Sequence, residues 1–90
     1  DTRAYIYLKM GEYEKALVDY NKVFENDARF PASLLGCGLV YAALEQPDKA
    51  KKLLEEGLES IVKFKVEHPD PQLQDLMDMS KKKLDELNQK

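Results

Sequence analysis

Two stretches of sequence repeat each other and decide the fold: residues 4–24, AYIYLKMGEYEKALVDYNKVF, and residues 38–58, GLVYAALEQPDKAKKLLEEGL. Placed one above the other, they pair Ala4 with Gly38, Tyr7 with Tyr41 and Ala16 with Ala50, each pair 34 residues apart. Small residues fall on small ones, and large apolar residues fall on large ones. A fixed period of this length is typical of a helix–turn–helix unit in a solenoid. The sequence therefore predicts an all-α fold built as a right-handed repeat solenoid.

Glycines, prolines and apolar spacing divide the chain into five expected helices. The first covers residues 2–10 and ends at Gly11, because glycine accepts the left-handed conformation that closes a helix. The second covers residues 12–25, with apolar residues spaced by three and four as an amphipathic helix requires. The third runs from Pro31 to residue 44 and is apolar nearly all round, which predicts burial on more than one side.

The last two expected helices lie on either side of a proline-rich break. The fourth runs from Pro47 to about residue 67, and His68-Pro69-Asp70-Pro71 then interrupts any regular helix. The fifth covers residues 72–88. It has an apolar stripe made of Leu73, Leu76, Met77, Ser80, Leu84 and Leu87, and a polar face made of Asp75, Asp78, Lys82, Asp85 and Glu86.

These residues resemble the tetratricopeptide repeat family. The first copy of the signature is Ala4, Tyr7, Gly11, Tyr13, Ala16 and Tyr20, and the second is Gly38, Tyr41, Ala50, Leu54 and Gly57. Small residues let paired helices approach closely, and the large ones fill the space beside them. Some positions depart from the family pattern: Glu45 and Pro47 stand where the family usually has Gly and Tyr, and Ala28 and Val62 stand where it usually has Pro.

The resemblance implies one domain made of two repeats and a cap. Residues 1–28 form a first repeat that lacks its opening residues, and residues 29–68 form a second repeat with an extended second helix. Residues 69–90 show no third copy of the pattern and resemble the C-terminal helix that caps such arrays. A cap with a polar outer face keeps a repeat protein soluble.

In this family the first helix of each repeat lines a concave groove, so the resemblance also implies a binding surface. By position, Tyr5, Leu8 and Lys9 would line it from the first helix, and Ala32, Leu35, Leu39, Ala42 and Ala43 from the third. Such an apolar groove suits an amphipathic helix or an extended apolar peptide. The alternative is that Leu35 and Leu39 pack inside the core against the second and fifth helices. The cationic clamp that binds acidic chaperone tails in one subclass is missing, because its positions hold Asp1, Tyr5 and Gly36.

Composition and motifs argue against several other classes. The net charge of −3 is mixed along the chain, whereas nucleic-acid binders usually carry a basic stripe. No apolar run approaches the roughly 20 residues that span a bilayer. The single histidine, His68, has no ligand-type neighbours, and the single cysteine, Cys37, lies in the most apolar helix. We therefore expect no enzyme activity, no metal and no cofactor.

Two functions remain open at this stage. The first is a protein–protein interaction scaffold or adaptor that binds a peptide or helix of another protein. The second is a structural or self-association module, in which the same surfaces form a homo-oligomer or pack against other repeats. The sequence leaves the compartment open, and the cytoplasm is the default.

Overall fold

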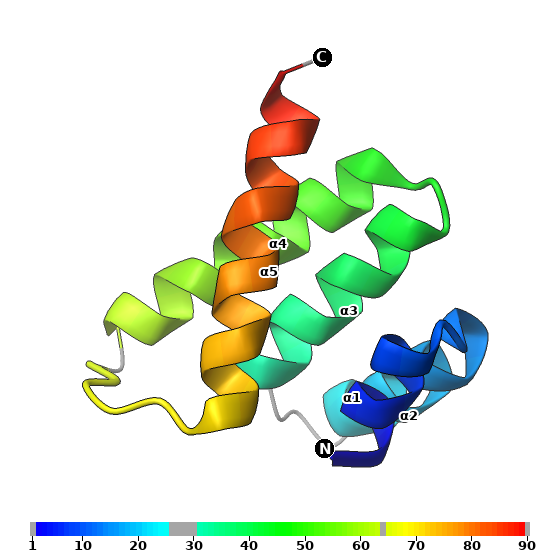
Figure 1. Cartoon of the computed structure of the whole chain (residues 1–90), viewed down its shortest axis with the longest axis horizontal. Helices are drawn as coiled ribbons and strands as arrows, with labels where there is room; N and C mark the ends of the chain where they lie inside the picture. Colours follow the sequence, from blue (N-terminus) through cyan, green and yellow to red (C-terminus); the bar gives the residue numbers. More distant parts are fainter. Residues whose placement is uncertain (1, 26–30, 64, 90) are drawn as a thin grey trace.

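The computed structural model describes residues 2–25, 31–63 and 65–89, which form helices and the turns between them, with no strand in these ranges. The helices are α1 (Thr2–Met10), α2 (Tyr13–Glu25), α3 (Pro31–Ala43), α4 (Pro47–Lys63) and α5 (Pro71–Asn88). Figure 1 shows α1 and α2 as one hairpin, α3 and α4 as a second, and α5 crossing the second hairpin. The all-α repeat fold predicted from the 34-residue period is confirmed.

The two repeats share the same turn, hydrogen bond for hydrogen bond. In the first, the amides of Gly11 and Glu12 donate to the carbonyls of Leu8 and Tyr7. In the second, the amides of Glu45 and Gln46 donate to the carbonyls of Ala42 and Tyr41. This pattern is the Schellman motif, in which one residue is left-handed. Gly11 has φ 83° and Glu45 has φ 62°, so the turn is retained although the second repeat lacks the glycine.

A lysine–tyrosine contact also recurs with the period. The ammonium of Lys15 lies 5.8 Å from the ring centroid of Tyr7, and that of Lys49 lies 5.5 Å from the ring centroid of Tyr41. Both distances are within the reach of a cation–π interaction. Each contact joins the two helices of one repeat across its turn.

Small residues lie where helices approach most closely. A Cβ atom added to Gly38 would lie 2.9 Å from the side chain of Leu54 and 3.1 Å from its backbone nitrogen. One added to Gly36 would overlap the ring of Tyr20. Ala16 and Ala50 are fully buried, as expected for helix crossings. The most extensive helix packing in the molecule is that of α3 against α4.

The fourth helix ends earlier than the sequence indicated. We expected it to reach residue 67, but α4 stops at Lys63. Lys65 takes a left-handed φ of 52°, and the amides of Lys65 and Val66 donate to the carbonyls of Val62 and Ile61, 3.1 Å away in each case. This is a third Schellman motif, and its left-handed position is occupied by Lys65 instead of glycine. Val66 is half-buried and packs against the core, which favours the turn over another helical step.

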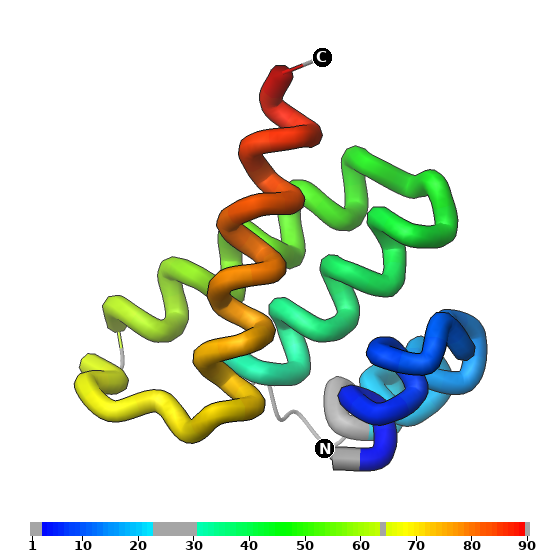
Figure 2. The backbone as a smooth tube through the Cα atoms, in the orientation of Figure 1, coloured from blue at the N-terminus to red at the C-terminus, as the bar shows by residue number. Residues whose placement is uncertain are grey.

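The fifth helix begins at Pro71, one residue before the expected start and inside the proline-rich break. The side chain of Asp70 accepts a hydrogen bond of 2.8 Å from the amide of Leu73. α5 packs mainly on α3 and less on α4, where Leu76 and Ser80 are buried. The tube in Figure 2 shows that α5 passes across the direction of α3 and α4 rather than along either helix.

Candidate interaction surface

The expected groove residues divide into a buried and an accessible set. Leu35 is fully buried, and Leu39 and Leu8 are 5% and 6% exposed. Tyr5, Ala32 and Ala42 are half-buried, whereas Lys9 and Ala43 are exposed. Accessible groove residues therefore come from both α1 and α3.

Leu35 and Leu39 are buried in this structure and do not line an open groove, and their role in binding stays a prediction. Leu35 packs against α4, because a Cβ on Gly57 would lie 2.7 Å from its Cδ2 atom. Both leucines belong to the same buried cluster as Leu54 and Leu76, and Leu76 comes from α5. Both leucines are therefore buried, as the alternative interpretation expected. α5 packs on α3 and takes the space that an open groove would leave.

One polar cluster joins the two ends of the helix array. Asp75 on α5 accepts a hydrogen bond of 2.5 Å from the hydroxyl of Tyr5 and one of 3.1 Å from the ammonium of Lys9. Lys9 Nζ also lies 3.9 Å from Sδ of Met79. Tyr5 and Lys9 are one turn apart on α1, and Asp75 and Met79 are one turn apart on α5, so the two pairs face each other.

The electrostatics of the cluster follow from these contacts. The hydrogen bond from Tyr5, with that from Lys9, holds the pKa of Asp75 below its ordinary value. The same hydrogen bond raises the pKa of Tyr5, because it favours the protonated hydroxyl. The sequence placed Asp75 on the polar outer face of its helix. No sequence signal indicated the contact between Tyr5 and Asp75, because the two residues are 70 positions apart.

A second ion pair lies at the edge of the first repeat. The guanidinium of Arg3 donates to both carboxylate oxygens of Asp19, at 2.7 and 2.8 Å. The Asp19 side chain is 5% exposed, and the hydrogen bond from Arg3 holds its pKa below the ordinary value. Two parallel charge-assisted bonds fix α1 on α2 with a defined geometry.

An apolar patch lies on the outer side of the first repeat. Ile6 is 48% exposed and Met10 is 67% exposed, one turn apart on α1. Their equivalents 34 residues later are covered: Val40 is fully buried and Leu44 is half-buried. In the second repeat this face is covered, because α3 packs against α2 of the first repeat. The same face of α1 is left exposed.

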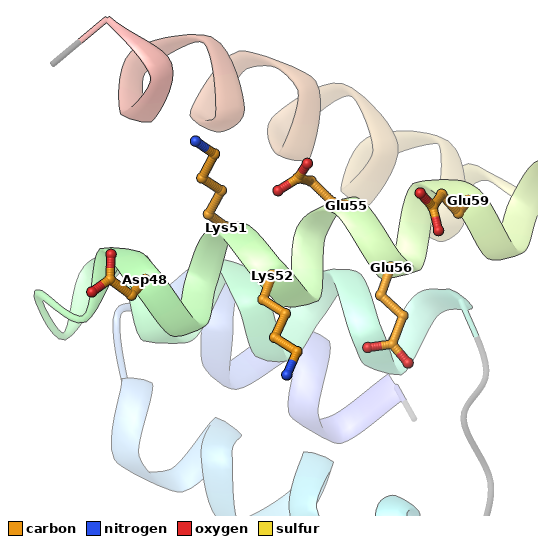
Figure 3. Close-up of a pocket in the computed structure, with 6 residues that line it drawn as sticks. All are labelled: Asp48, Lys51, Lys52, Glu55, Glu56 and Glu59. Atoms are coloured by element: carbon orange, nitrogen blue, oxygen red, sulfur yellow. The ribbon is translucent and has the colours of Figure 1, made fainter.

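A shallow hollow on α4 is lined by charged side chains that do not form a binding site. It is lined by six charged residues of that helix, drawn in Figure 3: Asp48, Lys51, Lys52, Glu55, Glu56 and Glu59. In the figure Lys51 and Glu55 point to one side of α4, and Lys52 and Glu56 point to the other. Side chains that diverge in this way do not converge on a ligand, so this surface is an exposed helix face.

Metal-binding and membrane-spanning features are absent from the residues described above. Within these ranges, no group of three or more His, Cys, Asp or Glu side chains is placed to hold a metal ion. None of the helices, over the same residues, is both long and apolar enough to cross a membrane. Two buried side-chain atoms in this part of the chain lack a hydrogen-bond partner, the hydroxyls of Tyr20 and Ser80. Burial raises the pKa of Tyr20.

Two helical hairpins with matching turns, a common period and a crossing fifth helix define a helical-repeat protein. Residues 4–45 match the family model of the TPR repeat, which covers α1, α2, α3 and the following turn. This match supports assignment of residues 4–45 to the tetratricopeptide repeat family, as the signature residues in that stretch indicated. The searches of curated proteins and of solved structures found no match. TPR repeats generally mediate protein–protein interaction, and the family is typically a non-enzymatic interaction module.

Proposed function

We propose that the chain is a scaffold module that binds a peptide or an amphipathic helix of another protein on the side formed by α1, α3 and α5. Tyr5, Lys9, Ala42 and Ala43 would form its accessible edge, above the more deeply placed Leu8, Leu35 and Leu39. The observation that carries the proposal is that this side already accepts an amphipathic helix, because α5 packs there on α3.

The chemistry of the accessible edge suits a short apolar or amphipathic segment. Ala42 and Ala43 are small, so the backbone of a partner can come close to α3. Lys9 supplies one exposed cation on α1, at the position 34 residues before Ala43. A single cation pairs with one carboxylate rather than with a run of acidic residues.

Peptide selection tests this surface directly. Helical and extended peptides displayed in a library would be selected against the chain, and their binding measured to Ala43→Arg and to Asn21→Arg. Asn21 is exposed on α2, so its substitution adds the same bulk and charge on another side. We expect selected peptides to lose binding to Ala43→Arg and to retain it for Asn21→Arg. Peptides that bind all three proteins equally would place the interaction elsewhere.

Self-association is the second candidate function, and the exposed Ile6 and Met10 favour it. Their positions are covered in the second repeat, so a copy of the chain could cover them in the first. The mass from sedimentation velocity, measured over a range of concentrations, should rise for the wild-type chain and stay constant for Ile6→Glu. A wild-type mass that stays monomeric throughout would exclude this function.

A further inference from the structure

α5 is held in two different ways along its length. One row packs inward, where Leu76 and Ser80 are buried against α3 and α4. The other row, Asp75 and Met79, faces α1 and meets Tyr5 and Lys9. α5 therefore contacts the array as a bound helix would, with its apolar row against α3 and α4 and the carboxylate of Asp75 against α1.

The inward row holds α5 less firmly than its length suggests. Of its 18 residues only Leu76 and Ser80 are buried, and the buried Ser80 hydroxyl has no hydrogen-bond partner among the described residues. A buried polar group without a partner costs free energy. The other apolar residues of the helix are only half-buried, namely Leu73, Met77, Met79, Leu84 and Leu87. An element with few buried contacts opens at lower free energy than the whole domain.

The connection between α4 and α5 also allows α5 to open. Residues 65–70 contain no helix, and Lys65 there takes a left-handed φ of 52°. The left-handed Lys65 closes α4, so the chain leaves that helix before α5 begins. α5 can therefore open without breaking the hydrogen bonds inside α1–α4.

Opening would uncover a site with defined chemistry. Leu35 and Leu39 would form an apolar floor, and Tyr5 and Lys9 would present two hydrogen-bond donors that converge at its edge. These donors now converge on a single carboxylate. An incoming helix pairs with both donors at once when it carries a carboxylate beside its apolar row.

We propose that α5 is an intramolecular occupant of the surface formed by α1 and α3, exchanged for an amphipathic helix of another protein that presents a carboxylate to Tyr5 and Lys9. This rests on the function proposed above for the side formed by α1, α3 and α5, and adds the class of partner and its regulation. The apparent affinity for the partner is then set by the fraction of molecules in which α5 is open.

The test uses the full chain and a fluorescent synthetic peptide of residues 71–88, which is a helix of the required chemistry. Binding is measured by fluorescence anisotropy to the wild-type chain and to Asp75→Lys, whose own α5 loses both hydrogen bonds and is repelled by Lys9. We expect the variant to bind the peptide about tenfold more tightly than wild type. Asp78→Lys is the matched control, because Asp78 is an exposed residue of the same helix that contacts only Gln74 in the described structure, and it should behave as wild type.

A charge exchange identifies the contact. A peptide that itself carries Asp75→Lys should fail to bind the Asp75→Lys chain. It should bind the Lys9→Glu chain instead, because that chain's own Asp75 is repelled at position 9 while the peptide's lysine pairs there. Loss of the helical signal in Asp75→Lys would move the comparison to Asp75→Asn, for which a smaller gain, of about threefold, is expected.

Three results would overturn the proposal. The peptide could bind Asp75→Lys or Asp75→Asn no better than wild type. Its binding could ignore its own Asp75→Lys change. The Asp75→Lys chain could dimerise without peptide, which would assign this surface to α5 of a second copy. A different pair of results would refute only the surface given under the proposed function. In that case the selected peptides bind Ala43→Arg as well as wild type, while the 71–88 peptide binds Asp75→Lys more tightly as expected.

Discussion

Replacing Glu45 with glycine should stabilise the protein. Glu45 has φ 62° and closes α3 with the same two hydrogen bonds that Gly11 makes at the end of α1. A side chain in the left-handed region costs roughly 1–2 kcal/mol. Glycine removes that cost but makes the unfolded chain more flexible, which takes back roughly 0.5–1 kcal/mol. The expected net gain is therefore about 0.5–1 kcal/mol.

The magnitude converts into a measurable shift. For a domain of this size 1 kcal/mol moves the melting temperature by roughly 4–8 °C, so Glu45→Gly should raise it by about 2–8 °C. Thermal unfolding followed by circular dichroism at 222 nm would measure the shift.

Two further variants separate the backbone from the side chain. Glu45→Ala keeps the strain and should change the melting temperature little. Gly11→Ala introduces the strain at a position where an added Cβ has no neighbour within 4 Å, so it should destabilise through the backbone alone by about 1 kcal/mol. A Glu45→Gly protein that melts at or below the wild-type temperature would refute the strain at Glu45.

Three other predictions concern packing, pH and the cap. Ala50→Leu should overpack the fully buried crossing in the second repeat and cost about 1–3 kcal/mol, and an unchanged melting temperature would contradict the packing. Because the pKa of Asp19 is lowered in the folded state, its contribution to stability is present at neutral pH and is lost as the pH falls below about 4. Asp19→Asn should then show a smaller loss of melting temperature on acidification, and an identical acid profile would exclude the Arg3 pair as its cause. Truncation after Glu67 should cause aggregation or a lower melting temperature, because it uncovers the surface that Leu76 packs on, and a soluble and equally stable monomer would argue against a capping role for α5.

The helices could be placed from local features alone. Gly11, Pro31, Pro47 and the break before α5 are signals that a few neighbouring residues encode, and the observed helix bounds agree with them. The end of α4 could not be placed in this way, because Lys65 is not a residue that favours the left-handed conformation. Its Schellman turn is favoured by the burial of Val66, which depends on the rest of the fold.

The candidate surface was less accessible to sequence reasoning. The period correctly assigned Tyr5, Lys9 and Ala43 to accessible positions of α1 and α3, although their role in binding remains a proposal. It could not say that Leu35 and Leu39 would be buried, because an apolar row on α3 looks the same whether it lines a groove or meets another helix. The answer depended on where α5 packs.

The sequence by itself determined the repeat, its two hairpins and the small residues at their crossings, because these follow from periodic spacing within 34 residues. Only the tertiary structure decided how α5 lies across α3. That placement brings Asp75 to Tyr5 and Lys9, residues 70 and 66 positions away along the chain. No local pattern specifies such a contact, because it arises when a rigid helix settles on a packed surface and its polar row meets whichever donors the neighbouring helix presents there.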